Sequence, residues 1–331
     1  MANTRVTDTI LETPTGAIPN LGASKAEIQA HYDREPRLYE QFLGPNLAYS
    51  AGIWKEPANR DTLEAAQLRK LDWHIDMSGA DSAQRVLDVG FGWGSLIKRL
   101  MARRPDIDYV GLTLADNQAR YVRSYAPQNF VTEISAWQDY QSNRPFDAIV
   151  SLEAMEHFTG KTADRQQRIE AYRLFFEFCA RTLRTGGRAS IQVNGWGNIE
   201  LGSEARHIRE SGIDGFWLEG NLPHASEMLL ASERWFDLVH LEGKPRDYVY
   251  TLRAWYERFK TNHDAIVAMY DERFYRLYAF YLAASMTMFT DGGMCVYQLQ
   301  YMRSRYAAPI TRNYMIDDER RFTAAESARA G

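Results

Sequence analysis

The chain has 331 residues, of which 45% are hydrophobic and 25% are charged, and its formal net charge is −4. This composition is typical of a globular protein. The near balance of charge gives no broad electrostatic attraction for a nucleic-acid backbone or an anionic membrane, so we expect no nucleic-acid partner. The two cysteines, Cys179 and Cys295, are far apart in the sequence. Their spacing disfavours a disulfide scaffold and a zinc framework, and we expect no metal.

The N-terminal segment and the most apolar segment bear on localisation. Residues 1–16 lack the basic region and apolar run that mark a signal peptide. The most apolar stretch, residues 274–289, contains Arg276 and has 16 residues. That is shorter than the roughly 20 residues of a membrane-spanning helix. These features predict a cytoplasmic protein with no integral membrane segment.

The first part of the chain is predicted to be a tail followed by helices. Residues 1–23 are rich in Thr, Pro and Gly, which predicts a flexible N-terminal tail that could exchange between chains of a homo-oligomer. In residues 24–84, apolar residues recur at helical spacing. This pattern predicts an N-terminal helical segment, with helices over residues 24–33, 37–45 and 62–79.

Over residues 85–195, short β-rich runs alternate with helical segments. Such alternation predicts a parallel sheet with helices on both faces. The predicted strands are residues 85–92, 109–114, 146–155 and 189–196. The predicted helices are residues 95–104, 116–126 and 165–187, the last closed by the pair Gly186–Gly187.

Residues 196–290 break this alternation and contain mainly helical patterns. We interpret them as a substrate-binding helical cap that also carries one core strand. The predicted helices are residues 226–232, 251–270 and 274–289, and the predicted strand is residues 237–243. A final core strand is predicted within residues 291–304, where alternation follows an Asp-Gly-Gly turn. Residues 305–331 read as a C-terminal tail.

A glycine-rich loop is the strongest local signal. The buried run that contains Val86 and Val89 leads into Gly90, Gly92 and Gly94 and then into a helix. Glycine allows a sharp turn and the close approach of a ligand, and the N-terminus of the helix offers free N–H groups. Strand, loop and helix together predict the binding of a nucleotide-like cofactor.

The surroundings of the loop narrow the choice of cofactor. There is no Gly-Lys-Ser/Thr of a phosphate-binding loop, and the glycines step by two, unlike the dinucleotide fingerprint. The second predicted strand ends at Thr113 and Leu114, with Gln118 as the nearest polar residue, rather than in an acidic residue. A ligand with an adenosine, a cationic sulfur and no phosphate fits this loop, so we expect S-adenosylmethionine.

At family level, the segments RVLDVGFGWGSL, GLTLADNQ and FDAIVSLEAMEHF resemble the S-adenosylmethionine-dependent methyltransferases of the cyclopropane-fatty-acid synthase and mycolic acid cyclopropane synthase type. The similarity extends from HYDREPRLYEQFLGPNLAYSAGIW to YQLQYMR, about residues 30–303. It implies an α/β fold with the Rossmann-like sheet of class I methyltransferases. That sheet is mostly parallel with an antiparallel last strand, and it carries N-terminal helices that cover the cofactor and an inserted helical cap. Residues 85–195 would then be the cofactor-binding core.

The resemblance also implies which residues hold the cofactor, although core packing is the alternative role for each aromatic side chain. Tyr32, Tyr49 and Ser50 would close over the methionine moiety. Trp137 would flank the adenine, next to Gln138. The complete predicted set is Tyr32, Tyr49, Ser50, Asp88, Gly90, Gly92, Gly94, Thr113, Leu114, Gln118, Trp137 and Gln138.

Family members transfer the methyl group of a sulfonium to an alkene carbon, which leaves a carbocation that must lose a proton. In the cyclopropane synthases a bound bicarbonate is the proposed base, held by a Cys, a Glu, a His, an Ile backbone and a Tyr. The matching positions here are Ala51, Glu156, Gln192, Asn194 and Tyr248. The Glu and the Tyr are retained, whereas the Cys and the His are lost. This departure disfavours a bicarbonate-dependent ring closure.

A second carboxylate could replace that base. Glu153 stands where relatives commonly have a Gly, and Glu153, Glu156 and His157 follow one another at i, i+3 and i+4. On a turn or short helix this spacing places them on one face. A carboxylate in an apolar pocket has a raised pKa and can accept a proton directly. The alternative is that Glu153 is a solvated or capping side chain.

These observations predict a C-methyltransferase that acts on an unsaturated lipid-like or isoprenoid-like substrate. The proton would pass to Glu156, or to Glu153 with Tyr248 assisting, and the product would be a methylated, cyclised or cyclopropanated alkene. One alternative is an N- or O-methyltransferase of a small natural product, in which Glu156 and His157 orient or deprotonate the acceptor. Another is a cofactor-binding protein without catalytic activity.

Overall fold

The computed structural model describes residues 18–32, 34–55, 57–199 and 221–304. Its centre is a seven-stranded sheet with the order β3-β2-β1-β4-β5-β7-β6. Strands β1 to β5 run parallel, whereas β7 runs antiparallel to both β5 and β6. This confirms the predicted sheet with an antiparallel last strand. The strands are β1 (Arg85–Val89), β2 (Asp108–Thr113), β3 (Phe130–Ile134), β4 (Phe146–Leu152), β5 (Leu183–Trp196), β6 (Asp237–Gly243) and β7 (Met294–Met302).

Helices cover both faces of the sheet, so alternate strand residues enter two different cores. Leu87 and Val89 of β1 are buried in the core on one face of the sheet, whereas Val86 is buried in the core on the opposite face. Burial on both faces is typical of parallel strands. The covering helices are α3 (Leu63–Ser78), α4 (Ser95–Arg103), α5 (Asp116–Arg123), α6 (Arg165–Thr182) and α8 (Ala225–Ser232), and α8 lies against α6.

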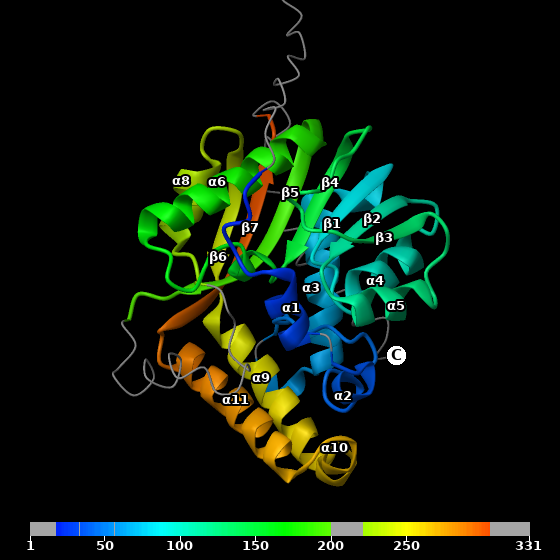
Figure 1. The fold of residues 1–331 in the computed structure, drawn as a ribbon, viewed down its shortest axis with the longest axis vertical. Coiled ribbons are helices and arrows are strands. Elements are labelled where there is room, and N and C mark those ends of the chain that lie inside the picture. The colour runs from blue at the N-terminus through cyan, green and yellow to red at the C-terminus, as the bar shows by residue number, and fades with distance from the viewer. Residues whose placement is uncertain (1–17, 33, 56, 200–220, 305–331) are drawn as a thin grey trace, which may run out of the picture.

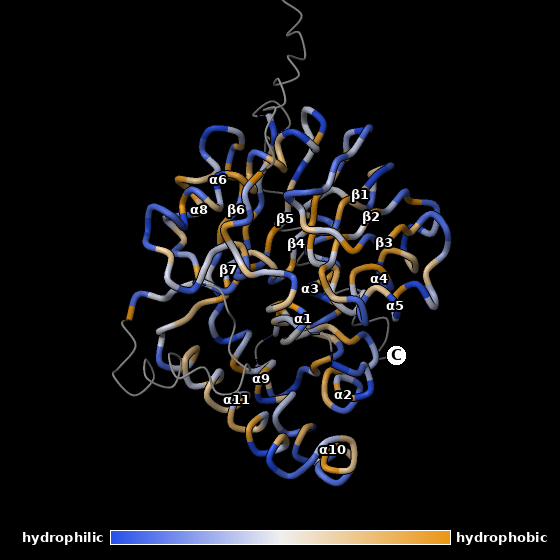
Figure 2. Tube along the Cα trace, viewed as in Figure 1, coloured by the Kyte–Doolittle hydropathy of each residue, from blue (hydrophilic) through white to orange (hydrophobic). Residues whose placement is uncertain are grey.

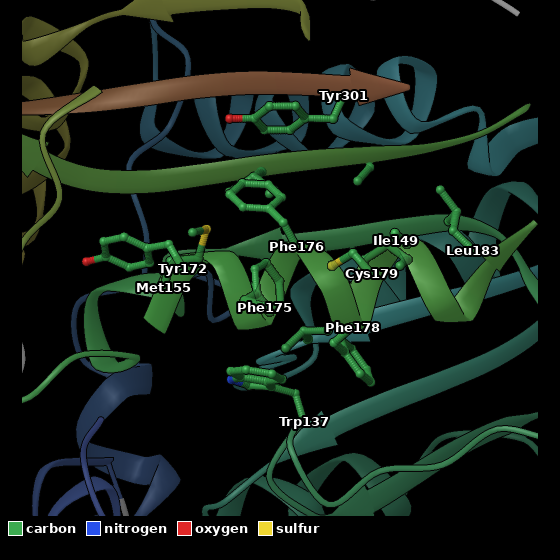
Figure 3. Close-up of a cluster of buried hydrophobic side chains, with 14 of the residues drawn as sticks. Trp137, Ile149, Met155, Tyr172, Phe175, Phe176, Phe178, Cys179, Leu183 and Tyr301 are labelled. Atoms are coloured by element: carbon green, nitrogen blue, oxygen red, sulfur yellow. The ribbon is translucent and has the colours of Figure 1, made fainter. Parts of the chain in front are cut away.

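Helix α6 supplies much of the apolar core on its face of the sheet. It begins with a capping box in which Asp164 accepts from the backbone of Gln167 and the side chain of Gln167 accepts from Asp164. Its residues Phe175, Phe176 and Cys179 are buried and lie among the core side chains in Figure 3. The long predicted helix therefore forms because its apolar stripe is covered by the sheet.

The end of α6 differs from the prediction. The helix stops at Thr182 because Leu183 is extended, with φ −86° and ψ 138°, and begins β5. Gly186 and Gly187 lie inside β5 instead of capping the helix. A Cβ added at Gly187 would lie 2.6 Å from Cγ of Leu183. The glycine is therefore needed for close packing where the register between β4 and β5 is irregular.

Two more parts of the structure differ from the prediction made from the sequence. Strand β3 was not predicted, because it lies at the edge of the sheet, where Val131 is 43% exposed and no continuous buried run forms. The helix predicted over residues 251–270 is two helices, α9 (Pro245–Thr261) and α10 (His263–Met269). They are separated at Asn262, whose Nδ2 donates to the carbonyl oxygen of Gln41 at 2.7 Å.

A helical layer lies below the carboxyl ends of the parallel strands in Figure 1. Its inner side is aromatic: the ring of Phe42 makes edge contacts with Trp255 and Phe259, at centroid distances of 6.3 Å and 5.7 Å, and lies 5.6 Å from Tyr278. The layer joins the N-terminal helices to the predicted cap. Its elements are α1 (Lys25–Tyr32), α2 (Pro36–Glu40), α9, α10 and α11 (Glu272–Thr290).

Hydropathy follows these layers. Figure 2 shows hydrophobic stretches on the central strands and hydrophilic residues along the outer loops. Among the described helices, none is both long enough and apolar enough to cross a membrane. The part of the chain that the structure describes also contains three short 3₁₀ helices: η1 (Ala58–Arg60), η2 (Ala80–Ser82) and η3 (Met155–His157).

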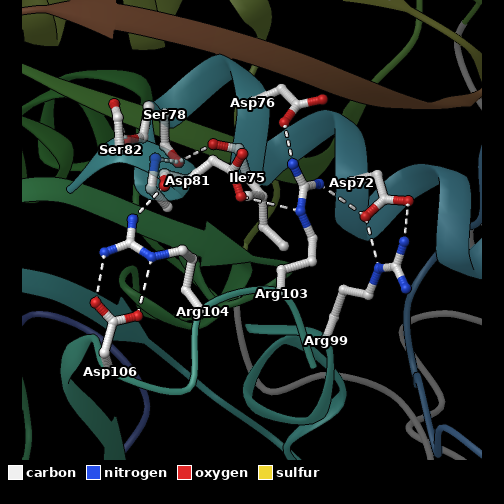
Figure 4. Close-up of polar contacts among 12 residues, drawn as sticks. Asp72, Ile75, Asp76, Ser78, Asp81, Ser82, Arg99, Arg103, Arg104 and Asp106 are labelled. Carbon is white, nitrogen blue, oxygen red and sulfur yellow. Dashed lines mark hydrogen bonds and ion pairs between the residues drawn. The ribbon is translucent and has the colours of Figure 1, made fainter. Parts of the chain in front are cut away.

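Ion pairs connect α3 and α4. Arg99 donates to both carboxylate oxygens of Asp72 at 2.6 Å, and Arg103 bridges Asp72 at 2.9 Å and Asp76 at 2.8 Å, as Figure 4 shows. Paired, partly buried guanidinium–carboxylate contacts of this kind are stronger than single exposed ones. The network thus holds α3 in place while its inner face contacts β4 and β5.

Candidate active site

A pocket lies at the carboxyl ends of β1 and β4, which are neighbours in the sheet. Gly90 and Gly92 line it from the loop after β1, and Glu153 and Ala154 line it from the loop after β4. A Cβ added at Gly90 would lie 2.6 Å from Cβ of Ala154, so glycine lets the two loops touch. The strand order reverses between β1 and β4, and open α/β sheets bind ligands at such a point.

Most residues predicted to hold the cofactor line this pocket. They are Tyr49, Ser50, Asp88, Gly90, Gly92, Thr113, Leu114, Gln118, Trp137 and Gln138. Gly94 is placed elsewhere: a Cβ there would lie 2.8 Å from Cγ2 of Val122, so this glycine allows close packing against α5. The predicted contact of Tyr32 lies outside the described side chains, although the residue ends α1.

The polar atoms and the open space of the pocket fit S-adenosylmethionine. Gly92 has a φ of 55°, and a Cβ added to it would meet nothing within 4 Å, so the loop leaves room for a ligand. Tyr109 donates to one carboxylate oxygen of Asp88 at 2.7 Å, and burial raises the pKa of Asp88 to about 7. Among the described residues, Oδ1 of Asp88 and Nε1 of Trp137 have no hydrogen-bond partner. Oδ1 of Asp88 is thus available as an acceptor, and Nε1 of Trp137 as a donor, for the adenosine and amino-acid parts of the cofactor.

Residues 18–23, which were predicted to belong to a flexible tail, form part of the pocket. Asn20 and Ala23 line it. The backbone N–H of Ala23 donates to the carbonyl oxygen of His157 at 2.9 Å, and Nε2 of Gln138 donates to Oδ1 of Asn20 at 3.3 Å. The folded structure therefore begins before residue 24. The available signal was the Asn-x-Gly turn, in which the N–H of Gly22 donates to Oδ1 of Asn20.

Glu153 is the centre of the polar network at the edge of the pocket. Three groups donate to its carboxylate: the backbone N–H of Ala51 at 2.8 Å, Nε2 of Gln192 at 2.6 Å and the hydroxyl of Tyr248 at 3.0 Å. Burial raises the pKa of Glu153, while these donors and the charge of Lys70 oppose the rise. Glu153 is partly buried and bonded, not a solvated side chain.

The backbone of Glu153 is strained. Its φ of 55° lies in the left-handed region that favours glycine. Its N–H donates to the carbonyl oxygen of Gln192 at 2.7 Å, which holds this conformation. Non-glycine residues persist in such a conformation only where their surroundings hold them, and this occurs often at functional sites.

Glu156 is more deeply buried than Glu153. It lies in η3, is 1% exposed and does not line the pocket, whereas His157 does. The backbone N–H of Asn194 donates to Oε1 of Glu156 at 2.5 Å, and Oε2 has no partner among the described residues. Burial and the neighbouring charge of Glu153 raise the pKa of Glu156 well above its usual range.

Lys70 is a site residue that the sequence reading did not identify. It is fully buried on the inner face of α3, and its ammonium group donates to Oγ of Ser50 at 2.7 Å. Burial lowers the pKa of Lys70 to about 8, and the charges of Glu153 and Asp88 oppose this change. The ammonium group of Lys70 thus lies close enough to Glu153 and Asp88 to interact with both charges. Its helical neighbours give no sign of this role, because the pattern of α3 is that of an ordinary buried helix.

The side of the site toward the helical layer is aromatic. The ring of Tyr248 lies 4.6 Å from that of Phe289 and 5.9 Å from that of Trp255. The hydroxyl groups of Tyr49 and Tyr278 are hydrogen-bonded at 2.9 Å. Aromatic faces attract cations, so this wall suits a reaction in which positive charge develops on an apolar molecule.

Comparisons with known proteins agree with this geometry. The family model described as mycolic acid cyclopropane synthetase matches residues 21–299. The cyclopropane-fatty-acyl-phospholipid synthase of Escherichia coli K12 is 30% identical over 277 residues, which are 82% of this chain and 66% of that protein. The chain thus spans just under two thirds of the length of this relative. The hydroxymycolate synthase MmaA4 of Mycobacterium tuberculosis is 28% identical over 297 residues, which are 85% of this chain and 94% of that protein.

Solved structures support the same assignment. The mycolic acid cyclopropane synthase CmaA1, in complex with S-adenosylhomocysteine and CTAB, aligns with a TM-score of 0.73 and 26% identity and covers 86% of this chain and 100% of that chain. S-adenosylhomocysteine is the demethylated form of the cofactor that the sequence predicted, and the cofactor prediction is confirmed at the level of the family. The family model covers most of the chain. The chain therefore belongs to the mycolic acid cyclopropane synthetase family of S-adenosylmethionine-dependent methyltransferases.

Proposed function

We propose that this chain transfers a methyl group to an alkene carbon of an unsaturated lipid-like or isoprenoid-like acceptor, and that Glu153 accepts the proton released afterwards. One observation carries the proposal. The carboxylate of Glu153 receives the N–H of Ala51, the amide of Gln192 and the hydroxyl of Tyr248. These are three of the positions that the family resemblance assigns to the binding of bicarbonate. The carboxylate of Glu153 would thus take the place of the bicarbonate that the resemblance implies for the cyclopropane synthases.

The two buried carboxyl groups differ in a way that favours Glu153 as the base. Glu153 has three donors and the nearby cation of Lys70, which stabilise its ionised form. Glu156 also receives hydrogen bonds, from Asn194, but deeper burial and the negative charge of Glu153 outweigh them and favour its protonated form. When surroundings separate the pKa values of two neighbouring carboxyl groups, they indicate the roles of acid and base. Glu153 also lines the pocket.

The remaining steps follow from the walls of the site. When bound, S-adenosylmethionine supplies an electrophilic methyl group. The electron pair of the acceptor double bond forms the new C–C bond as the S–C bond breaks, and the neighbouring acceptor carbon becomes cationic. Tyr49, which lines the pocket, and Tyr248, which donates to Glu153, would shield that cation from water. Proton loss to Glu153 from the added methyl group closes a cyclopropane, whereas loss from an adjacent carbon leaves a methylated alkene.

The names of the relatives support an apolar acceptor. The E. coli protein is named for fatty-acyl phospholipids, and CmaA1 was crystallised with CTAB, a long-chain amphiphile. An aromatic inner layer built from Phe42, Trp255 and Tyr278 is compatible with a chain of this kind. Prenyl chains share the same apolar, unsaturated character, so both acceptor classes belong in the test.

The test is product identification. The purified chain is incubated with S-adenosylmethionine that carries a deuterated methyl group and with two panels: vesicles of dioleoyl phosphatidylglycerol, and soluble prenyl diphosphates. We expect a deuterated methyl group or methylene bridge on carbon, identified by mass spectrometry and NMR. Label on nitrogen or oxygen of a small-molecule panel would instead establish the alternative N- or O-methyltransferase. Cofactor binding with no labelled product in any panel would refute the proposed reaction.

A further inference from the structure

A fully buried set of side chains controls the orientation of Gln192. Its Nε2 donates to Oε1 of Glu153 at 2.6 Å and to the carbonyl oxygen of Ala51 at 3.1 Å. Its Oε1 accepts from Nε2 of Gln298 at 2.8 Å and lies 3.4 Å from Nε2 of His74. The amide therefore has acceptors on one side and donors on the other. If it turned over, its carbonyl oxygen would face the Glu153 carboxylate.

Three separate elements bring these groups together. Gln192 of β5 and Gln298 of β7 are directly paired across the antiparallel ladder. His74 comes from α3, which packs against β5. All three side chains are 0% exposed, so water does not compete for their hydrogen bonds. An amide that is buried and fully bonded in this way is held in one orientation.

The protonation of His74 fits a donor role. Burial and the charge of Lys70 lower the pKa of His74 to about 3, so the ring is neutral near pH 7 and carries one N–H. Its Nδ1 lies 2.8 Å from Oγ of Ser190, whose hydroxyl group can donate to it. With Ser190 as the donor to Nδ1, the single ring N–H is on Nε2, which lies 3.4 Å from Oε1 of Gln192, and the side chain of Gln298 also hydrogen-bonds to the ring.

We propose that His74 and Gln298 are positioning residues: they fix the amide of Gln192 so that its N–H remains on the Glu153 carboxylate. The proposal rests on the proposed function of Glu153 as the base. It extends the site to two side chains that do not line the pocket. Gln192 also holds the carbonyl of Ala51, whose own N–H donates to Glu153, so loss of its orientation would affect two of the three donors.

The charge of Glu153 responds to several groups around it. Lys70 comes from α3 and Glu156 from η3, while Tyr248 comes from α9 and Tyr281 from α11. None of these is changed by a substitution at residue 298. A change in the titration of Glu153 in such a variant therefore reports on the Gln192 amide.

The experiment measures the ionisation of Glu153 directly, without turnover. Glutamate labelled with ¹³C at the side-chain carboxyl carbon is incorporated, the signal of Glu153 is assigned by its loss in Glu153→Gln, and the pH is varied in the presence of S-adenosylhomocysteine. We expect Gln298→Met to raise the proton affinity of Glu153 at least threefold, in the same direction as Gln192→Met. The double variant should match Gln192→Met alone, because residue 298 acts through the amide.

Gln300→Met is the matched control. Gln300 lies two residues along the same strand, is equally buried and donates to the carbonyl oxygen of Met77, away from Gln192. If Gln298→Met shifts the titration no more than this control, or if the double variant is additive, the proposal is wrong. Should Gln298→Met fail to fold, Gln298→Asn tests the same contact by shortening its reach. Since the titration needs no methyl acceptor, a failure of the proposed reaction in the product assay would be seen separately.

Discussion

Replacing Glu153 by glycine tests whether this side chain substitutes for a bound anion. The substitution removes the carboxylate but leaves the N–H of Ala51, the amide of Gln192 and the hydroxyl of Tyr248 directed at the space it occupied. Glycine tolerates the φ of 55° at this position, so the backbone should lose strain of about 1–2 kcal/mol rather than rearrange. The variant should fold and bind S-adenosylhomocysteine as the wild type does.

The expected magnitudes follow from the contacts of the carboxylate. Loss of a positioned general base lowers a rate by about 10²–10⁴-fold. Hydrogen bonds to a charged group contribute about 1.5–3 kcal/mol each, so three of them offer an added anion roughly 5–9 kcal/mol. Immobilising the anion costs about 4 kcal/mol, which leaves about 1–5 kcal/mol, or a Kd between about 0.2 mM and about 0.2 M. Formate or bicarbonate at tens of millimolar should therefore restore much of the lost rate.

The assay is the initial rate of labelled methyl transfer in the Glu153→Gly variant, with sodium chloride of equal ionic strength as the control. Glu153→Ala is a second control, because its Cβ keeps the strained backbone and partly fills the space. Full activity of Glu153→Gly without an added anion would refute the role of Glu153 as the base. A folded, cofactor-binding variant that is inactive and that no small carboxylate rescues would refute the idea that the three donors form an anion site.

Two further predictions concern pH. Tyr248→Phe removes one hydrogen bond to the Glu153 carboxylate, worth about 1.5–3 kcal/mol, and should raise the pKa of Glu153 by about 1–2 units. The acidic limb of the pH profile of kcat/KM should move upward by the same amount, and an unmoved limb would contradict the assignment. His74 has a pKa lowered to about 3 in the folded chain, whereas an unfolded histidine titrates near pH 6.5. Below pH 6.5 the unfolded state therefore binds the extra proton, and the stability due to His74 falls by about 1.4 kcal/mol per pH unit. Urea unfolding should thus find the advantage of the wild type over His74→Asn shrinking from pH 6 to pH 4, and a constant difference would contradict the neutral, buried ring.

The sequence predicted the sheet and much of the pocket because both have local signals. The buried run around Val89 ends at glycines. Residues that directly follow a parallel strand lie at the edge of the sheet where the cofactor binds, so their place in the sequence predicts that they line the pocket. The same reasoning failed at β3, where Val131 faces solvent, and at the end of α6, where Leu183 enters a strand. In both places the outcome depends on neighbouring strands, which are distant in the sequence.

The polar network behind Glu153 has no such local signal. Lys70 and His74 sit in an ordinary helical pattern, and Gln298 sits in an ordinary strand. Each is buried only because α3, β5 and β7 pack together. The resemblance indicated that position 192 had lost a histidine, but it gave no sign that a glutamine there would bond to Glu153 and be held by two other buried side chains.

Glu156→Gln decides which of the two carboxyl groups works as the base. Glutamine has the size of a protonated glutamic acid, and its Oε1 can still accept from the N–H of Asn194. If Glu156 is protonated during turnover, as its raised pKa indicates, the substitution should change kcat by no more than about threefold, which is about 0.7 kcal/mol. Glu153→Gln, measured beside it, should lose about 10²–10⁴-fold as expected for a missing base. The reverse pattern would assign the proton to Glu156, and the three donors on Glu153 would then serve to hold the loop after β4 rather than to ionise a base.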